Sequence, residues 1–347
     1  MSSQRITARR TAAGVVLAGL AALSLAACGS AASSTEAGAS GGSSQSVSAE
    51  ASWPRTVSTD DGELTLKEQP QRIVSTSTTL TGALLAIDAP VVASAATSPN
   101  IDGLSDANGF FSQWSSQAKA AGVEKLYENA SPNLEKVAEY EPDLIVVAKN
   151  SGDSVMNSVD QLRKISDVLV VDYSGSSWED VTTMVAKATG HEKEAEGKIA
   201  DFNAHLQEAK SKIAVPEGDT SALIVFGDGS GAAALTEEAS QVQIMNELGF
   251  QMATIPDSVK GDTSMGADRK DIVNLSMENV QKGLTGQNWI VVSADDKAKA
   301  QIKDDKAFNT APAVKAGKVA YTPGETFRLD YYSAIMLVDS LVESFGK

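Results

Sequence analysis

Residues 192–213 read EKEAEGKIADFNAHLQEAKSKI, and their pattern indicates how the rest of the chain is organised. Its apolar residues stand at positions 195, 199, 202, 206, 209 and 213, and steps of four and three place them on one face of a helix. Gly190 and Pro216 favour helix ends on either side. A helix of this length spans roughly 33 Å. We predict a stiff connecting helix over residues 191–215; a surface helix of a single large domain is the alternative.

Strands and helices alternate on the N-terminal side of this helix. The expected strands are 63–66, 72–75, 91–95, 143–148 and 168–172, and the expected helices are 80–87, 134–140 and 159–165. This alternation is typical of a parallel α/β sheet. It predicts an N-terminal α/β lobe over residues 53–190.

The same alternation returns on the C-terminal side. The expected strands are 221–226, 251–255, 289–293 and 319–321, and the expected helices are 239–248, 278–282 and 329–345. The glycine-rich segment 227–231 fits neither the Walker spacing nor the dinucleotide-binding spacing of phosphate loops, and it is interpreted as a turn. The predicted fold is therefore α/β: two Rossmann-like lobes joined by a single long α-helix, the second lobe covering 216–347, with a ligand cleft between them.

The first 52 residues carry a different kind of signal. A basic start and an apolar stretch precede the sequence Leu-Ala-Ala-Cys, so residues 1–27 are expected to be a lipoprotein signal peptide and Cys28 the lipidated residue. An ordinary signal peptide is the alternative, and Arg9-Arg10 leaves twin-arginine export open. The Gly- and Ser-rich segment that follows Cys28, up to residue 52, predicts a flexible tether. We expect an extracytoplasmic protein held to the outer face of the cell membrane by lipid alone.

The charge excludes one class of partner. The chain has a formal net charge of −16, and removal of the signal peptide would take away three arginines and no acid, leaving −19. A strongly acidic chain argues against nucleic acid binding. We expect the protein itself to be a monomer.

Residues suited to catalysis or to metal binding are scarce. The two histidines, His191 and His205, lie on the polar side of the connecting helix, and no further ligands join them. We therefore expect no enzyme activity, no cofactor and no metal site. A lipid-anchored α/β hydrolase would need an activated nucleophile, and a surface adhesion module would leave the long helix unexplained; both are weaker alternatives.

Several motifs resemble the ferric-enterobactin binding proteins of siderophore ABC importers. They are QRIVSTSTTLTGALLAIDAPVVASAATSPN at 71–100, GFFSQW at 109–114 and GETFRLDYYSA at 324–334. PNLEKV and EPDLIV within 131–146 resemble the wider family that binds siderophores, haem and cobalamin. The resemblance implies two lobes that close modestly on a ferric siderophore and deliver it to a transmembrane permease dimer. Haem, cobalamin or a hydroxamate siderophore remains the alternative ligand.

A ferric tris-catecholate carries negative charge and flat aromatic faces, which arginine can both neutralise and stack against. The resemblance implies a ligand-contacting arginine at Arg328 and a second at Arg269. Lys149 follows a strand end in the first lobe and is a further candidate. Ion pairs with neighbouring acids are the alternative for both arginines.

Other candidates lie in the first lobe and at the start of the last helix. Hydroxyl and N–H groups of Ser75, Thr76 and Ser77 could meet catecholate oxygens, or cap the following helix. Phe111 and Trp114 could stack on the ligand or belong to the core. Tyr331, or its neighbour Tyr332, could face the cleft.

One departure from the family pattern and one internal repeat complete the expectation. Residues 100–112 carry no basic residue where the relatives carry arginine, so Lys149 or Lys119 could compensate, and the exact siderophore stays open. Each lobe repeats a short helix that opens with a glutamate, Glu135 and Glu278. The resemblance implies that these two glutamates dock onto the permease; a role in the helix dipole is the alternative.

Overall fold

A computed structural model describes residues 52–260 and 270–347. These residues belong to one compact unit of the chain. The predicted signal peptide, Cys28 and almost all of the tether lie outside the described residues.

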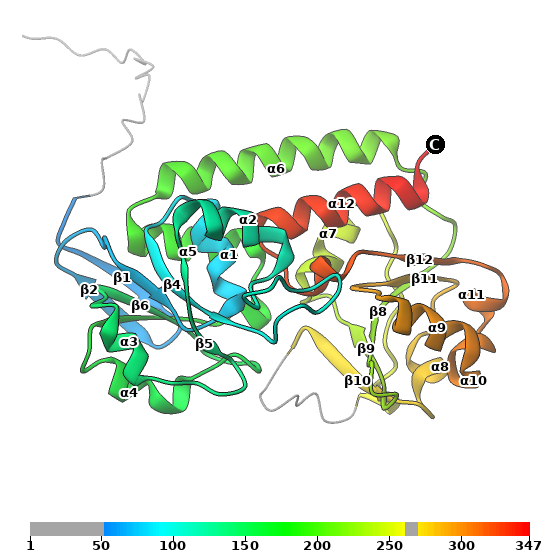
Figure 1. Ribbon diagram of the computed structural model, residues 1–347. Helices are drawn as coiled ribbons and strands as arrows, with labels where there is room; N and C mark the ends of the chain where they lie inside the picture. Colours follow the sequence, from blue (N-terminus) through cyan, green and yellow to red (C-terminus); the bar gives the residue numbers. More distant parts are fainter. Residues whose placement is uncertain (1–51, 261–269) are drawn as a thin grey trace, which may run out of the picture. The chain divides into compact units, whose positions relative to one another are not determined.

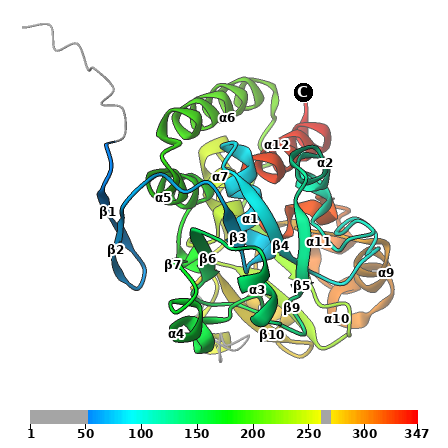
Figure 2. The same cartoon turned by 60° about the vertical axis from the view of Figure 1, so that its left-hand side comes forward.

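Five parallel strands form the first sheet, in the order β5-β4-β3-β6-β7. They are β3 (Ile73–Ser75), β4 (Val91–Ala96), β5 (Glu124–Glu128), β6 (Leu144–Ala148) and β7 (Asp167–Val171). Every residue of β6 is buried, because a parallel strand at the centre of an α/β sheet is covered on both faces. A hairpin of β1 (Arg55–Thr59) and β2 (Gly62–Leu66) lies beside β7 (Figure 2).

Helices cover both faces of this sheet. Alternate strand residues such as Leu144 and Val146 pack against α1 (Thr78–Ala86), α2 (Ser112–Ala121) and α5 (Trp178–Thr189). The opposite face, with Ile145 and Val147, packs against α3 (Glu135–Glu139) and α4 (Val159–Leu162). This three-layer arrangement is the first lobe.

The second sheet has the order β10-β9-β8-β11-β12 and is mixed rather than parallel. Its strands are β8 (Thr220–Val225), β9 (Gly231–Leu235), β10 (Ile272–Ser276), β11 (Asn288–Val291) and β12 (Val319–Tyr321). β8, β11 and β12 are parallel, whereas β9 runs antiparallel to both β8 and β10. The fully parallel arrangement expected from the alternation is therefore wrong for this sheet.

The strand predicted at 251–255 is also wrong. Within it, Met252 makes only an isolated bridge to Thr220 at the start of β8. β8 is paired with β11 on one edge and with β9 on the other from Leu223 onward, so little of it remains available to a further strand.

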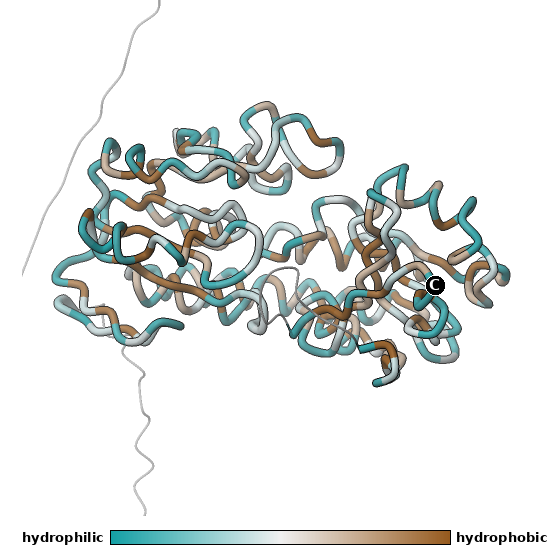
Figure 3. Tube along the Cα trace, turned by 90° about the horizontal axis from the view of Figure 1, so that it is seen from below, coloured by the Kyte–Doolittle hydropathy of each residue, from teal (hydrophilic) through white to brown (hydrophobic). Residues whose placement is uncertain are grey.

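Helices also sandwich the second sheet, which together with them forms the second lobe. α7 (Ser240–Leu248) and α12 (Tyr331–Phe345) cover the face that carries Ala222 and Ile290. The other face packs against α8 (Val280–Gly283), α9 (Asp296–Asp304), α10 (Lys306–Asn309) and α11 (Pro312–Lys315). Figure 3 shows apolar segments inside each lobe and hydrophilic segments toward the outside.

The long helix α6 (Glu192–Lys212) connects the lobes, as predicted. Ala195 belongs to the first-lobe core, and Phe202, Leu206 and Ala209 belong to the second-lobe core. α12 lies alongside α6, and Figure 1 shows the two helices running together. The two-lobe α/β fold with one connecting helix is confirmed.

Candidate ligand-binding site

A cavity of about 820 Å³ lies between the two lobes. The first lobe contributes the loop Ile101–Leu104, which follows β4. The second lobe contributes the end of β8 with its following turn, residues along β10, and the segments around Ser293 and Arg328. The volume falls in the range of small-molecule sites, so the cavity is the ligand-site candidate.

Two glycines bring the lobes together at the cavity wall. A Cβ atom on Gly324 would lie 2.0 Å from the carbonyl oxygen of Gly103, which is backbone and cannot swing aside. Both glycines line the cavity. Close approach of the two backbones therefore depends on the missing side chain.

Arg328 follows a 3-10 turn, Gly324–Phe327, whose backbone is held from two helices. Gln241 on α7 donates from Nε2 to the carbonyl oxygens of Thr326 at 3.0 Å and Phe327 at 3.2 Å. Ser333, in the first turn of α12, donates from Oγ to the carbonyl oxygen of Arg328 at 2.9 Å. The turn and the start of α12 thus fix the point from which the arginine side chain projects.

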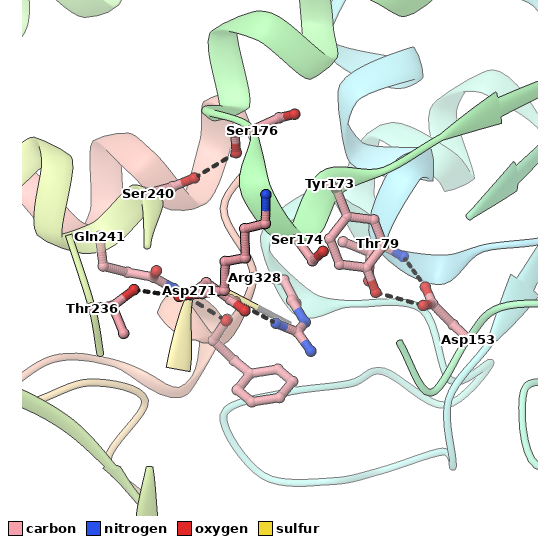
Figure 4. Close-up of polar contacts among 12 residues, drawn as sticks. Thr79, Asp153, Tyr173, Ser174, Ser176, Thr236, Ser240, Gln241, Asp271 and Arg328 are labelled. Carbon is pink, nitrogen blue, oxygen red and sulfur yellow. Dashed lines mark hydrogen bonds and ion pairs between the residues drawn. The ribbon is translucent and has the colours of Figure 1, made fainter. Parts of the chain in front are cut away.

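The Arg328 guanidinium lies between groups of both lobes (Figure 4). Its Cζ atom is 4.5 Å from the ring centre of Phe327 and 5.5 Å from that of Tyr173 in the first lobe. Nη1 is 3.9 Å from Oδ2 of Asp271, and both side chains are 15% exposed. Arg328 lines the cavity, and it also lines a smaller pocket of about 40 Å³ beside Tyr173.

Acidic side chains dominate the charged lining of the cavity. Asp102, Asp228 and Asp295 line it, and Arg328 is the one cation among the described residues that do so. Asp295 accepts a hydrogen bond from Ala298 N at the start of α9, and hydrogen bonds from Ser230 lower the pKa of Asp228. All three carboxylates are exposed to solvent, which weakens their repulsion of an anion.

The hydroxyl cluster after β3 does not reach the cavity. Ser75, Thr76 and Ser77 are each 0% exposed. Ser75 donates to the Ser77 carbonyl oxygen, Thr76 donates to the Val146 carbonyl oxygen, and Ser77 caps α1 and donates to Asp153. The hydroxyl groups of all three residues therefore form hydrogen bonds within the first lobe, and we leave these residues out of the candidate site. Ser77 caps the following helix, which was the alternative role expected for it.

The aromatic candidates lie in the cores. Trp114 is 0% exposed and packs against Phe110, with ring centres 5.3 Å apart, and Phe111 is buried as well. Tyr331 packs against Trp178 and lies under Lys198 Nζ of α6, on the connecting-helix side. None of the three is among the described residues that line the cavity.

The candidate lysines also face elsewhere. Lys149 donates from Nζ to the carbonyl oxygen of Asp60 at 2.7 Å, so its ammonium group lies against the β1–β2 turn. Lys119 is exposed in the last turn of α2. Neither compensates at the cavity wall for the arginines absent from 100–112.

Arg269, Glu135 and Glu278 are the remaining predicted residues. Arg269 lies outside the described residues and stays a prediction. Glu135 begins α3 in the first lobe, and Glu278 lies between β10 and α8 in the second; both are exposed. In Figure 1, α3 and α8 lie on the side of the molecule away from α6.

Sequence reasoning missed several residues that line the cavity. Phe226 precedes the glycine-rich turn and Asp228 belongs to it, and this Gly-Asp-Gly-Ser-Gly pattern after a strand was the available signal. Tyr173, which lines the smaller pocket beside Arg328 rather than the cavity, was also missed, although it follows β7 at the same sheet edge as the Ser/Thr cluster. Phe327 lies within the motif at 324–334, which was the available signal for it.

Within residues 52–260 and 270–347, no group of three or more metal-ligating side chains gathers. His205 pairs with Asp339 at 2.8 Å, and His191 with Thr189 at 3.1 Å. Among the described helices, none combines the length and the apolar character needed to cross a membrane.

Comparisons with known proteins agree with this geometry. The chain is 41% identical over 295 residues, 85% of its length, to the ferric enterobactin-binding periplasmic protein FepB of Escherichia coli O6:H1, of which it covers 92%. The crystal structure of holo-ViuP superposes with a TM-score of 0.77 at 29% identity, covering 85% of this chain and 96% of that one. The triscatecholate siderophore binding protein FeuA of Bacillus subtilis, complexed with ferri-bacillibactin, shares the fold at a TM-score of 0.61 and 17% identity, covering 83% of this chain and 97% of that one.

The family model for periplasmic binding proteins matches residues 68–326, which include both sheets, the connecting helix and most of the cavity lining. The chain belongs to the periplasmic binding protein family.

Proposed function

We propose that this protein captures a ferric catecholate siderophore in the cavity between its lobes and delivers it to the permease of an ABC importer. The observation that carries the proposal is the inter-lobe cavity with Arg328 in its wall, in a chain 41% identical to a ferric enterobactin-binding protein. The proposed role is binding without catalysis, and the iron is held by the siderophore rather than by the protein.

Arg328 supplies the chemistry that such a ligand requires. Its guanidinium is planar, permanently charged and weakly hydrated, so it can contact catecholate oxygens and lie flat against an aromatic ring. The side chain is 15% exposed, in a partly desolvated position where a charge-assisted hydrogen bond is worth more than in water. Arg269, next to the described segment at Lys270, is proposed as a second contact.

Delivery requires contact with the permease. We propose that Glu135 and Glu278, one exposed glutamate in each lobe, pair with basic residues of a transmembrane dimer. Two equivalent acids suit a partner with two-fold symmetry. Lipidation of Cys28 would hold this monomeric protein at the outer face of the membrane, within reach of the permease.

Titration of tryptophan fluorescence tests the binding step. Trp178 lines the small pocket beside Arg328, so a coloured iron chelate in the cavity should quench its emission. Ferric enterobactin should quench saturably, and Arg328→Gln should weaken its binding about tenfold or more, since hydrogen bonds to charged groups contribute about 1.5–3 kcal/mol. Saturation by ferrichrome, haem or cobalamin, with no response to ferric enterobactin, would contradict the proposal.

A less negatively charged iron chelate is the second candidate. The specific observation is the excess of carboxylates, Asp102, Asp228 and Asp295, over the single described cation in the cavity lining. The substitution Asp102→Asn distinguishes these two candidate ligands. It should strengthen binding of triply charged ferric enterobactin by roughly twofold through reduced repulsion and leave a neutral chelate unchanged.

A further inference from the structure

The ring of Tyr173 extends from the first lobe to the guanidinium of Arg328 on the second-lobe side. Arg328 Cζ lies 5.5 Å from this ring centre, and the Phe327 ring lies 4.5 Å from the same atom. Two aromatic rings therefore lie against one cation, and this arrangement restricts the plane of the guanidinium. Of these two rings, that of Tyr173 belongs to the opposite lobe, so it couples the arginine to the position of the first lobe.

Asp153 holds the Tyr173 ring in place. The tyrosine hydroxyl donates to Oδ1 of Asp153 at 2.5 Å, and it also lies 3.4 Å from Thr79 Oγ1. Oδ2 of Asp153 accepts hydrogen bonds from Ser77 Oγ at 2.5 Å and from Thr79 N at 3.3 Å. Asp153 is 7% exposed, and each of its oxygens has a donor within the first lobe (Figure 4).

These residues come from three neighbouring strand ends. Ser77 and Thr79 follow β3, Asp153 follows β6 and Tyr173 follows β7, and those strands are adjacent in the sheet. The carboxyl ends of parallel strands meet at one edge, where α/β proteins place binding residues. Burial and the neighbouring Asp153 carboxylate raise the pKa of Tyr173 to about 12, so its hydroxyl stays a neutral donor.

We propose that Tyr173 and Asp153 are positioning residues that fix the Arg328 guanidinium at the cavity wall and thereby set the affinity for anionic iron chelates. The identity of the ligand rests on the proposed function; the positioning itself does not. Arg328 is the one cation among the described lining residues, so on this part of the cavity wall one long side chain carries the positive charge. A flexible arginine would lose rotamer entropy on binding, and prior fixation removes that loss.

A double-mutant cycle tests the proposal in the mature protein. Tyr173→Leu removes the ring, Tyr173→Phe removes only the hydroxyl, and Arg328→Gln removes the cation. For ferric enterobactin, Tyr173→Leu should weaken binding about tenfold in the wild-type background and less than about twofold with Arg328→Gln, because the ring acts through the arginine. The affinity of the Tyr173→Phe variant should lie between those of wild type and Tyr173→Leu.

The matched control is Tyr140→Leu. Tyr140 is also a first-lobe tyrosine whose hydroxyl bonds a carboxylate, that of Glu124 at 3.1 Å, but it lies outside the cavity lining. Its replacement should leave affinity unchanged. Equal losses from Tyr173→Leu with and without Arg328 would show a general structural role and overturn the proposal.

A ligand-free measurement separates this inference from the proposed function. The Nε–Hε resonance of Arg328, assigned by its loss in Arg328→Gln, should carry a ring-current shift that changes in Tyr173→Leu and not in Tyr140→Leu. If ferric enterobactin fails to bind wild type while this shift behaves as stated, the ligand assignment is wrong and the positioning stands. An Arg328 resonance unaffected by Tyr173→Leu overturns the positioning.

Discussion

Asp330 forms hydrogen bonds with residues of both lobes. It caps α12 by accepting from Ser333 N at 3.0 Å, and Gln113 of α2 in the first lobe donates to it at 3.4 Å. A Cβ atom on Gly82 of α1 would lie 2.1 Å from its Oδ2, so a glycine there admits the carboxylate. The FRLDYY motif pointed to Arg328 and contains this aspartate, but its cross-lobe contacts depend on residues more than 200 positions away.

Among the residues predicted from the sequence, the one marked by a long motif lies in the cavity wall, whereas those suggested by hydroxyl chemistry alone do not. Arg328 lines the cavity. Ser75, Thr76 and Ser77 have suitable groups, but their hydrogen bonds are made to their own lobe. Whether a polar group is free is a tertiary property, and no local pattern contains it.

Asp330 should make stability depend on pH. Burial raises its pKa from 3.8 to about 6, so its contribution to stability is fully present below about pH 4 and is lost as the pH rises through 6. Asp330→Asn keeps the cap and cannot titrate. Between pH 4 and pH 7, wild type should lose about 2–3 kcal/mol more unfolding free energy than the variant, measured by urea denaturation. If the free energy of unfolding changed equally with pH in the two proteins, the pH dependence assigned to Asp330 would be contradicted.

At the scale of elements, periodicity predicted the long helix well and the second sheet poorly. The apolar steps along 195–213 match α6, whose buried residues include Phe202 and Leu206. β9 reads Gly-Ala-Ala-Ala-Leu, without the β-branched or aromatic residues typical of strands, yet all five residues are buried. Small residues are accommodated there by packing from the neighbouring strands, which sequence alone does not show.

Two glycine substitutions should change stability in opposite directions. Gly324→Ala places a methyl group against the Gly103 carbonyl, and such overpacking costs about 1–3 kcal/mol. Gly197→Ala lies in α6 with no atom within 4 Å of the new Cβ, and should stabilise by about 0.5–1 kcal/mol through helix propensity. Thermal unfolding measures both. A stable Gly324→Ala protein with unchanged ligand affinity would argue against close lobe contact at this point.

At the scale of the whole molecule, the two lobes repeat one plan around the cavity. Each has a sheet between two layers of helices, and α6 contributes to both cores. A single helix packed into both lobes is a stiff connection, which favours small closing movements over wide hinge opening. The sequence predicted this plan because alternation and helix length are long-range patterns; the cavity lining comes from loops, whose course the patterns do not specify.

Charge reversal at the two exposed glutamates should separate binding from transport. Glu135→Lys with Glu278→Lys should leave ferric enterobactin affinity unchanged, since neither residue lines the cavity. Iron uptake by cells carrying the protein and its importer should fall by about tenfold or more, because a pairing contact becomes a repulsion. Glu139→Lys, on the same helix as Glu135, is the control. Normal uptake by the double variant would contradict the docking proposal.

The most direct test of the central claim is the position of the iron atom in crystals of the protein soaked with ferric enterobactin, located by anomalous scattering at the iron edge. We expect a single strong peak inside the inter-lobe cavity, next to the Arg328 guanidinium and between the 101–104 loop and β10. Iron bound elsewhere on either lobe, with the cavity unchanged, would contradict it.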